Sequence, residues 1–395
     1  MTTYDWIVIG AGFTGSALSY ELAKQGFRVL LLEKDARLEN ATYYSYGGLA
    51  YWSGTTQLTR QLCREGIEIH RHLSEELGEN TEFRDIDLIL TINVEDDPKT
   101  IATNYSSFAI APQLLDMAEA CELEPLLNPY AISGVLRFPH AHIHPHKTNR
   151  AYQQAFCRLG GEIIIESVVS LLRQDNRIEG AITTQNTYYA ANTAVCTGGL
   201  SKALLKEAGI NITLYFTHAQ LILTPPVDIC LRTIVMPATQ KRLMLETKAT
   251  EPEMKSQWDE GTEDLVASIL DPGAVQFRDR SFCIGQISSI ATNPYARIDL
   301  AASEIKIRTE VGNILPLIQN LPGTCHNCLV TFAKNSLPLI GAIQNYSGIY
   351  LFSGFTSTLV FAPPLARHFA CWAATKKDNI IAQLSTNQEE QCENY

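Results

Sequence analysis

The sequence lacks the features of a membrane or nucleic-acid-binding protein. No apolar run in its 395 residues reaches the roughly 18 residues of a membrane span. A formal net charge of −11 argues against nucleic acid or an anionic membrane surface as the main partner. The chain enters an apolar segment within a few residues of its start, which leaves no room for a secretory signal. We therefore expect a soluble, cytoplasmic protein with no membrane and no nucleic-acid partner.

Metal and disulfide signals are equally weak. The ten cysteines are scattered along the chain and predict neither a zinc site nor a disulfide framework, so no metal is expected. There is no internal repeat and no low-complexity linker. Only the end of the chain, QLSTNQEEQCENY at 383–395, resembles a frayed tail.

What is present is a glycine-rich motif near the N-terminus, in VIGAGFTGSALSYELAKQGFRVLLLEKD. Residues 5–9 form an apolar run typical of a buried parallel strand. Gly10 permits a tight turn, Gly12 allows close approach of a pyrophosphate, and Gly15 lets the following helix pack on the strand. The N-terminus of that helix, which begins near Thr14, then faces the phosphates.

A second strand and an acidic residue complete this unit. Residues 28–32 are predicted to form a second buried strand, and Glu33 follows them 18 residues after Gly15. This is close to the separation of about 20 residues at which a carboxylate accepts hydrogen bonds from a ribose. The motif alone allows FAD or a nicotinamide dinucleotide. Because no second GxGxxG occurs, one bound FAD is the simpler prediction.

Regular helix and strand patterns occur in three separate parts of the chain. They are 1–75, 145–211 and 337–395, whereas 76–144 and 212–336 are richer in charge and proline. The pattern predicts an α/β nucleotide-binding domain of the Rossmann type, interrupted by insertions that build a second, discontinuous substrate domain.

Three further segments resemble the D-amino-acid oxidase and glycine/sarcosine oxidase family of flavoproteins. They are ATYYSYGGLAYWSG after Glu33, the stretch that ends in VCTGG, and SLPLIGAIQNYSGIYLFSGFTSTLVFAP near the C-terminus. The resemblance implies an FAD-binding domain joined to a substrate domain on a mainly antiparallel sheet. It also implies the FAD-binding residues Gly10, Gly12, Phe13, Thr14, Gly15, Glu33, Lys34, Gly47, Gly48, Leu49, Val169, Thr197, Gly198, Gly354, Phe355, Thr356, Ser357, Thr358 and Leu359, with Val169 at the adenine.

The C-terminal segment suits a flavin on physical grounds as well. Gly354 allows close backbone approach, and residues 356–358 are good N-cap candidates before an apolar helix over 359–374. A helix N-terminus beside the N1/C2 edge of a flavin would stabilise the negative charge of the reduced ring.

The family's carboxylate anchors are largely missing. Val330 stands where many relatives have an arginine, and Phe361 stands where the sarcosine-oxidase branch has a lysine. Of that branch's GDTRxxR pattern, SGTTQLTR keeps only Arg60. Arg60 is thus the predicted counter-charge for a substrate carboxylate, and an apolar amine or an N-substituted amino acid is as open as a simple amino acid.

A row of histidines and a group of tyrosines are candidates for the substrate side. His140, His142, His144 and His146 alternate, which would place them on one face of a strand. Metal binding, lining of the substrate cavity and packing are all open for them. Tyrosines 43, 44, 46 and 51 with Trp52 fit either a pocket wall or core packing. We take Tyr51 and His144, with Arg60, as candidate catalytic residues.

Cys328 raises the question of covalent attachment. In the sarcosine-oxidase branch the cysteine of CxYT binds the flavin 8α-methyl carbon, and Cys328 of CLVT matches it. His326 or Lys334 would have to favour the thiolate. Since Val330 replaces the tyrosine of the motif, we expect FAD to be held without a covalent bond.

These observations predict an FAD-dependent oxidoreductase that oxidises a C–N bond of an amine or amino acid. The flavin N5 would accept the hydride, water would hydrolyse the imine, and oxygen or another acceptor would reoxidise the flavin. Two alternatives are a flavin monooxygenase acting on a secondary metabolite and a non-catalytic flavin-binding protein.

Overall fold

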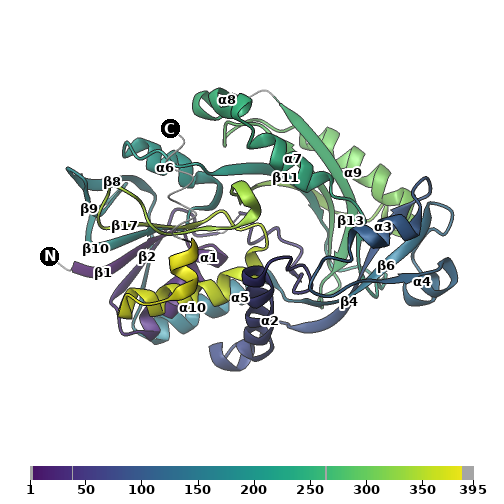
Figure 1. Cartoon of the computed structure of the whole chain (residues 1–395), viewed down its shortest axis with the longest axis horizontal. Helices are drawn as coiled ribbons and strands as arrows, with labels where there is room; N and C mark the ends of the chain where they lie inside the picture. The colour runs from purple at the N-terminus through teal and green to yellow at the C-terminus, as the bar shows by residue number, and fades with distance from the viewer. Residues whose placement is uncertain (1–2, 38, 263–264, 385–395) are drawn as a thin grey trace.

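The computed structural model describes residues 3–37, 39–262 and 265–384, which are built around two β-sheets placed along the long axis of the molecule (Figure 1). The first sheet has eight strands: β1 (Thr3–Ile9), β2 (Val29–Glu33), β7 (Glu162–Ile165), β8 (Val168–Gln174), β9 (Arg177–Thr183), β10 (Thr187–Val195), β16 (Leu339–Ala342) and β17 (Ile349–Ser353). Their order is β16-β17-β10-β1-β2-β7, with the β8–β9 hairpin paired to the start of β10. From β17 to β7 neighbouring strands run parallel, as in a Rossmann-type sheet.

The apolar runs of the first sheet are explained by burial on both faces. Trp6 and Val8 pack on one face of β1, whereas Ile7 and Ile9 pack on the other. A parallel strand covered on both sides needs such a continuous apolar sequence. The confirmed strand-turn-helix-strand unit at the N-terminus follows directly from this pattern.

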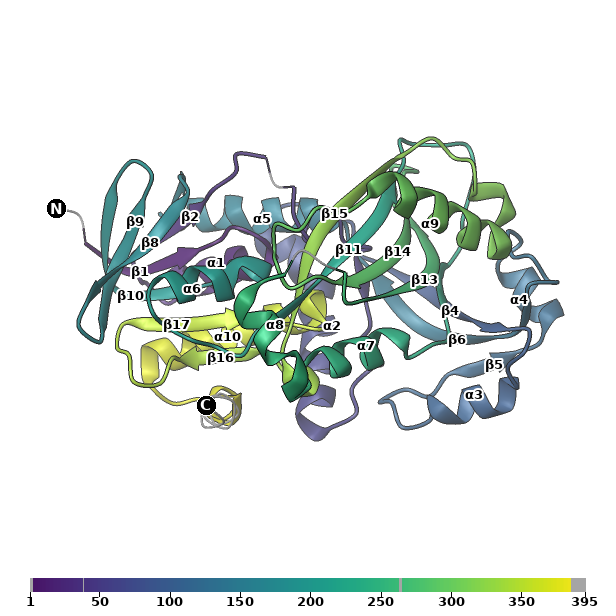
Figure 2. The same cartoon turned by 90° about the horizontal axis from the view of Figure 1, so that it is seen from above.

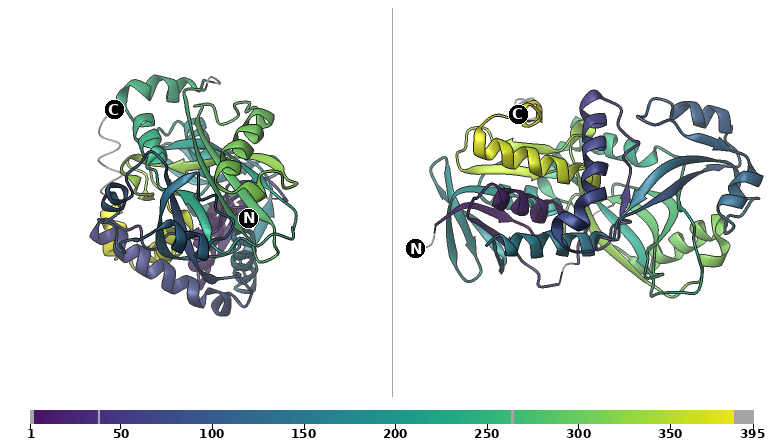
Figure 3. Two further views of the ribbon diagram at one scale, coloured as in Figure 1. Left: turned by 90° about the vertical axis from the view of Figure 1, so that its right-hand side faces the viewer. Right: turned by 90° about the horizontal axis from the view of Figure 1, so that it is seen from below.

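Helices cover one face of this sheet and the hairpin covers the other. The described helices are α1 (Phe13–Lys24), α2 (Gln57–Leu77), α3 (Pro98–Asn104), α4 (Met117–Leu123), α5 (Pro145–Arg158), α6 (Ser201–Glu207), α7 (Lys241–Ala249), α8 (Lys255–Glu260), α9 (Leu300–Ile314) and α10 (Thr358–Thr375). Helices α1, α5 and α10 lie side by side, and α2 crosses their ends (Figure 3, right). The β8–β9 hairpin and α6 pack on the opposite face.

The second sheet is mainly antiparallel, as the family resemblance implies. Its strands are β3 (Gly48–Leu49), β4 (Arg84–Asn93), β5 (Gln113–Leu115), β6 (Ile132–His142), β11 (Tyr215–Leu223), β12 (Ile234–Pro237), β13 (Ala267–Gln276), β14 (Phe282–Ile290) and β15 (Thr324–Phe332). Among the described strands of this second sheet, only the pairing of β12 with β4 is parallel. Figure 2 shows the two sheets next to each other along the molecule.

The two faces of the second sheet have different roles. One face packs against α9 and α4. The other, which we call the inner face, packs against residues 41–52, the chain that leaves the first sheet after β2. This segment joins the edge of the first sheet to the second.

Strand β3 lies within 1–75 but pairs with β6 of the second sheet, whereas the other strands of 1–75 belong to the first sheet. Gln383 and Leu384, which we expected in a frayed tail, are helical, and Leu384 is buried. The rest of that tail, 385–395, lies outside the described residues. Among the described helices, none is long and apolar enough to cross a membrane.

Candidate active site

Four of the predicted segments meet along one edge of the first sheet. Gly10 and Gly354 directly follow strands β1 and β17, Thr197 comes two residues after β10, and Glu33 is the last residue of β2. Because β17, β10, β1 and β2 are consecutive parallel neighbours, these residues lie beside one another at the carboxyl edge. Nucleotides bind at this edge in open α/β sheets.

The glycine turn is built by close backbone contacts. Gly10 has φ +101°, and a Cβ there would lie 2.7 Å from the carbonyl oxygen of Cys196. A Cβ on Gly15 would lie 1.9 Å from the carbonyl oxygen of Gly10. These two glycines are therefore required by the fold itself. Gly12, the N-cap of α1, has no side-chain cap, and a Cβ there would meet only the side chains of Thr42 and Asn40.

The backbone N–H and carbonyl of Ala11 are both hydrogen-bonded to side chains of the protein. Its N–H donates to Glu33 Oε2 at 2.7 Å. Its carbonyl accepts from Ser16 Oγ, Asn149 Nδ2 and Gln153 Nε2, each at 3.0 Å. The last two come from α5. This bracing leaves the start of α1 free to face a phosphate.

Glu33 is positioned for a ribose. Besides Ala11 it accepts the N–H groups of Lys34 and Asp35 on Oε1, at 2.8 and 3.2 Å. A carboxylate has about four lone-pair positions, so one position remains on Oε2. The Lys34 side chain is half-exposed and lies 3.4 Å from Asp35, so the contribution of Lys34 is restricted to its backbone here.

Asn40 and Thr42 were missed from the sequence. Thr42 Oγ1 accepts the N–H of Phe13 at 2.9 Å, and Asn40 Oδ1 accepts the N–H of Thr42 at 3.0 Å. Their side chains thus lie at the start of α1, beside Gly12. The only sequence signal was a polar NAT between the second strand and the tyrosines, which is typical of any loop.

The segment 47–49 is attached to β6 through histidines. Leu49 pairs with Ala141. A Cβ on Gly48 would lie 2.8 Å from His140 Nε2, and one on Gly47 would lie 2.2 Å from the carbonyl oxygen of Ile143. Packing under this segment explains why both residues are glycine.

Val169 and Gly198 fit their predicted roles at the dinucleotide. The register of the β8–β9 hairpin shifts between Val168 and Ser170, which leaves Val169 without a ladder partner. Its backbone groups are thus available to an adenine. Gly198 has φ +55° with open space where a Cβ would be, and Thr197 Oγ1 donates to Ser201 Oγ at 3.1 Å.

The turn between β17 and α10 is held in place by contacts with residues 333–336. Gly354 has φ +79°, and a Cβ there would lie 3.2 Å from Ala333 Cβ. Thr356 Oγ1 donates to the Ser336 carbonyl at 2.8 Å. Thr358 Oγ1 donates to the carbonyl of Phe355, a buried ring at the start of the turn.

Ser357, one of the three predicted candidates, is the N-cap of α10. Its side chain makes no capping hydrogen bond. Val360 and Phe361 donate to the Ser357 carbonyl. The N–H groups of Thr358 and Leu359, the first two of α10, therefore have no acceptor within the helix.

The three candidate catalytic residues are not brought together. Arg60 is exposed at the start of α2 and donates to the Ser107 carbonyl at 2.9 Å and to the Gly54 carbonyl at 3.4 Å. The His144 ring lies against Phe277, 5.1 Å between centroids. No recorded contact among the described residues joins Arg60, Tyr51 and His144, so their catalytic roles remain predictions.

The histidine row is regular only over its first half. His140 and His142 belong to β6 and share one face, but His144 is the N-cap of α5 and His146 lies within that helix. Pro145 begins the helix and ends the alternation. No group of three or more metal-ligating side chains occurs among the described residues.

His140 and His142 serve the segment 46–52. Trp52 Nε1 donates to His140 Nδ1 at 3.0 Å, and His142 Nε2 donates to the Tyr46 carbonyl at 3.0 Å. Burial lowers the pKa of His140 to about 3 and that of His142 well below its ordinary value, so both rings are neutral. Trp52 and Tyr44 are buried core residues, which favours packing over a pocket wall.

Cys325 and Cys328 form a C-x-x-C spacing, although no metal site or disulfide was expected from the cysteines. They lie on opposite faces of β15, Cys325 toward α9 and Cys328 on the inner face with Tyr44. Burial raises the pKa of Cys328 to about 12, so the thiol is protonated at neutral pH. His326 stacks on Tyr44 at 4.6 Å between ring centroids.

Arg242 of α7 was also missed. Its guanidinium lowers the pKa of the Cys328 thiol against the larger effect of burial. Arg242 Nε donates to Glu246 at 2.9 Å, and Thr239 donates to Asp271 at 3.1 Å nearby. No family motif pointed to this helix.

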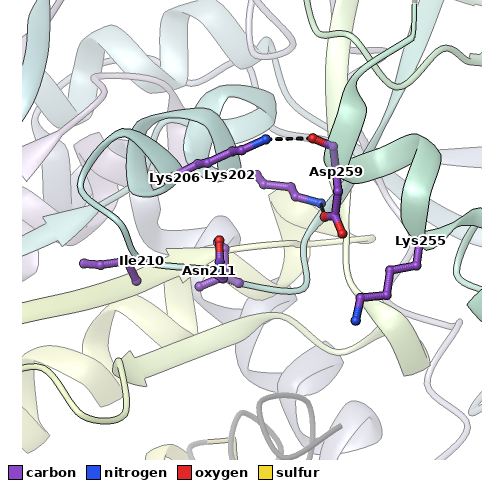
Figure 4. Close-up of a pocket in the computed structure, with 7 residues that line it drawn as sticks. Lys202, Lys206, Ile210, Asn211, Lys255 and Asp259 are labelled. Atoms are coloured by element: carbon purple, nitrogen blue, oxygen red, sulfur yellow. Dashed lines mark hydrogen bonds and ion pairs between the residues drawn. The ribbon is translucent and has the colours of Figure 1, made fainter. Parts of the chain in front are cut away.

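A pocket of about 310 Å³ lies elsewhere, between α6 and α8 (Figure 4). Its lining is Lys202, Lys206, Ile210, Asn211, Ile212, Lys255 and Asp259. Lys206 donates to the Asp259 carbonyl at 2.7 Å. None of the predicted site residues lines it, so it is separate from the candidate active site.

Comparison with known proteins identifies the family. The model of the family described as FAD dependent oxidoreductase matches residues 5–372, and the chain therefore belongs to this family. It is 24% identical over 265 residues to glycine oxidase of Geobacillus kaustophilus, a match that covers 62% of this chain and 70% of that protein. It is 28% identical over 215 residues to human peroxisomal sarcosine oxidase, covering 53% and 54% of the two chains.

Solved structures share the fold. The glycine oxidase of Geobacillus kaustophilus superimposes with a TM-score of 0.78 at 20% identity over 98% of both chains. L-proline dehydrogenase from P. horikoshii gives 0.77 at 18% identity over 99% of this chain and 98% of its own.

The protein is thus an FAD-dependent oxidoreductase, and its residues fit that cofactor. At the start of α1 Gly12 provides no side-chain cap, which suits a pyrophosphate even though the Phe13 N–H donates to Thr42. Glu33 suits a ribose, and the uncapped start of α10 suits the flavin.

Proposed function

We propose that this oxidoreductase oxidises a C–N bond of a small amine or amino acid. The observation that carries the proposal is the meeting of the predicted FAD-binding segments at one sheet edge, from which residues 41–52 continue onto the inner face of the second sheet. A substrate bound between the two would lie against the flavin.

The names of the relatives support this substrate class. They include glycine oxidase, sarcosine oxidase and 4-methylaminobutanoate oxidase, and the similar structures include L-proline dehydrogenase and iminodiacetate oxidase. Each of these names refers to an amine whose nitrogen is bonded to a carbon that carries hydrogen.

The proposed reaction needs no base that removes a proton from carbon, because the hydrogen leaves the carbon as hydride. The C–H bond next to nitrogen breaks, the amine loses two electrons and two protons in all, and a C=N bond forms. FAD, when bound, would supply the two-electron acceptor, and oxygen or another acceptor would reoxidise it. Water then adds to the imine and releases a carbonyl compound and an amine.

The protein must first receive the amine without its proton. Burial lowers the pKa of His144, which keeps that ring neutral and able to accept a proton, whereas burial raises the pKa of Tyr51 and keeps the phenol protonated. Of the two predicted groups, His144 is therefore the better base.

Product analysis tests the proposal. The FAD-loaded enzyme is incubated with a panel of N-methylated amines and amino acids, and carbonyl products are trapped with a hydrazine. Formation of an aldehyde or keto acid in step with acceptor reduction supports C–N oxidation. A hydroxylated product whose formation consumes NAD(P)H would instead indicate the monooxygenase alternative.

A further inference from the structure

Helix α10 contains two prolines that remove hydrogen bonds from its first turn. Pro363 and Pro364 have no N–H, so the carbonyls of Leu359 and Val360 cannot form the usual bond to the residue four positions later. Leu359 and Val360 are both buried, so water does not replace the missing donors. Another element must satisfy these oxygens.

Helix α2 supplies the donor. His70 Nε2 lies 2.7 Å from the Leu359 carbonyl oxygen, and the ring is fully buried. Since a carbonyl only accepts, Nε2 carries the hydrogen. Burial lowers the pKa of His70 to about 4, so the ring is neutral, and its Nδ1 has no hydrogen-bond partner among the described residues.

A glycine one turn earlier in α2 allows this contact. A Cβ on Gly66 would lie 2.1 Å from the Val360 carbonyl oxygen. Gly66 and His70 lie four residues apart and therefore on one face of the helix. Each faces one of the two carbonyls that the proline pair leaves without a helical donor.

The contact joins the parts that are proposed to surround FAD. Leu359 is the second residue of α10, and the His70 ring also lies parallel to Phe13 at the start of α1, 6.4 Å between centroids. Helix α2 itself begins at Gln57, shortly after the segment 46–52. His70 thus connects the starts of both helices that carry the predicted pyrophosphate and flavin contacts.

We propose that His70 is a positioning residue for FAD. Its N–H replaces the helical bond that Pro363 removes and fixes the first turn of α10, so that the N–H groups of that turn face the flavin. The inference rests on the proposed FAD site at this turn. It predicts that FAD affinity and flavin potential depend on the donor at position 70.

A double-mutant cycle tests it, because Pro363→Ala restores a helical N–H to the Leu359 carbonyl. His70→Leu should weaken FAD binding by the apo-protein about five- to tenfold, the factor that a buried hydrogen bond is worth, and should lower the midpoint potential. In the Pro363→Ala background, His70→Leu should weaken FAD binding less than about threefold. His70→Gln, which keeps a donor near Nε2, should stay close to wild type.

Controls separate the outcomes. His72→Leu makes the same change on the same helix at an exposed position and should leave affinity and potential unchanged. Equal losses with and without Pro363→Ala, or a lower Tm with unchanged affinity and potential, would overturn the proposal. If His70→Leu does not fold, His70→Asn, whose amide reaches only the Nδ1 position, replaces it in the cycle. Failure of the wild type to bind FAD would contradict the proposed FAD site instead.

Discussion

At the residue scale, two glycines of one motif have separate tasks. Gly15→Ala should destabilise the protein by about 1–3 kcal/mol or more, since its Cβ would overlap the Gly10 carbonyl. Gly12→Ala should leave the apo-protein folded, because the nearest atoms belong to the Thr42 and Asn40 side chains. It should still weaken FAD binding about ten- to a hundredfold through the lost phosphate contact.

Thermal unfolding of the apo-proteins measures the loss of stability, and FAD titration followed by fluorescence measures the loss of FAD affinity. A Gly12→Ala variant that binds FAD as tightly as the wild type would mean that the pyrophosphate does not pass this residue.

The state of Cys328 is a second residue-scale prediction. With a pKa of about 12, only about one thiol in 10⁵ is ionised at neutral pH, too little for attack on the flavin methyl group. FAD should therefore be held without a covalent bond. Acid precipitation should leave all the yellow colour in the supernatant, and a yellow pellet that Cys328→Ser abolishes would show the prediction to be wrong.

Two arginines compete for the role of carboxylate anchor. Arg60 is exposed and donates to the Ser107 carbonyl, whereas Arg242 donates to Glu246 and lowers the pKa of Cys328, a residue of the inner face. For a substrate with a carboxylate, Arg242→Ala should raise KM about tenfold or more, the value of one charge-assisted hydrogen bond, and Arg60→Ala less than about threefold.

Steady-state kinetics on the two variants decide between them. The opposite ranking would support the prediction made from the SGTTQLTR segment. No change in either variant would show that the substrate is not an anion.

At the scale of elements, His368 ties three pieces of chain together. Its ring bonds Glu65 of α2 at 3.0 Å and Asp378, just after α10, at 2.7 Å. The bonds to Glu65 and then Asp378 raise the pKa of His368. The charged ring therefore adds stability that is fully present below pH about 6.5, the ordinary value, and is lost as the pH rises through the raised pKa.

Unfolding measured across pH should show this loss. Between the ordinary and the raised pKa, the Tm difference between wild type and His368→Gln should shrink as pH rises. A difference that is constant, or that grows with pH, would mean that His368 is neutral in the folded protein.

The elements of the first sheet were predictable, and the residue partners were not. Continuous apolar runs with glycine at their ends specify buried parallel strands such as β1 and β2, and the helix predicted over 359–374 is α10 within one residue at each end. The break in the histidine row was also predictable, because Pro145 interrupts any regular strand, but the sequence did not show that α5 begins there.

The missing site residues have a common cause. Asn40, Thr42 and Arg242 come from a loop and a peripheral helix, and they reach the site only through tertiary packing. His70 had no sequence signal either, since its partner is a backbone carbonyl 289 residues away. Local patterns predict the elements, but they carry no information on such distant contacts.

At the scale of the whole molecule, we propose that an amine bound at the inner face of the second sheet reduces FAD held at the edge of the first. The most direct test is anaerobic mixing of the FAD-loaded enzyme with amines and amino acids, one at a time, without NAD(P)H. At least one compound should bleach the visible absorbance of the oxidised flavin within a single turnover, and admitting oxygen or an artificial acceptor should restore it. A flavin that no amine or amino acid bleaches, but that NAD(P)H does, would contradict the account.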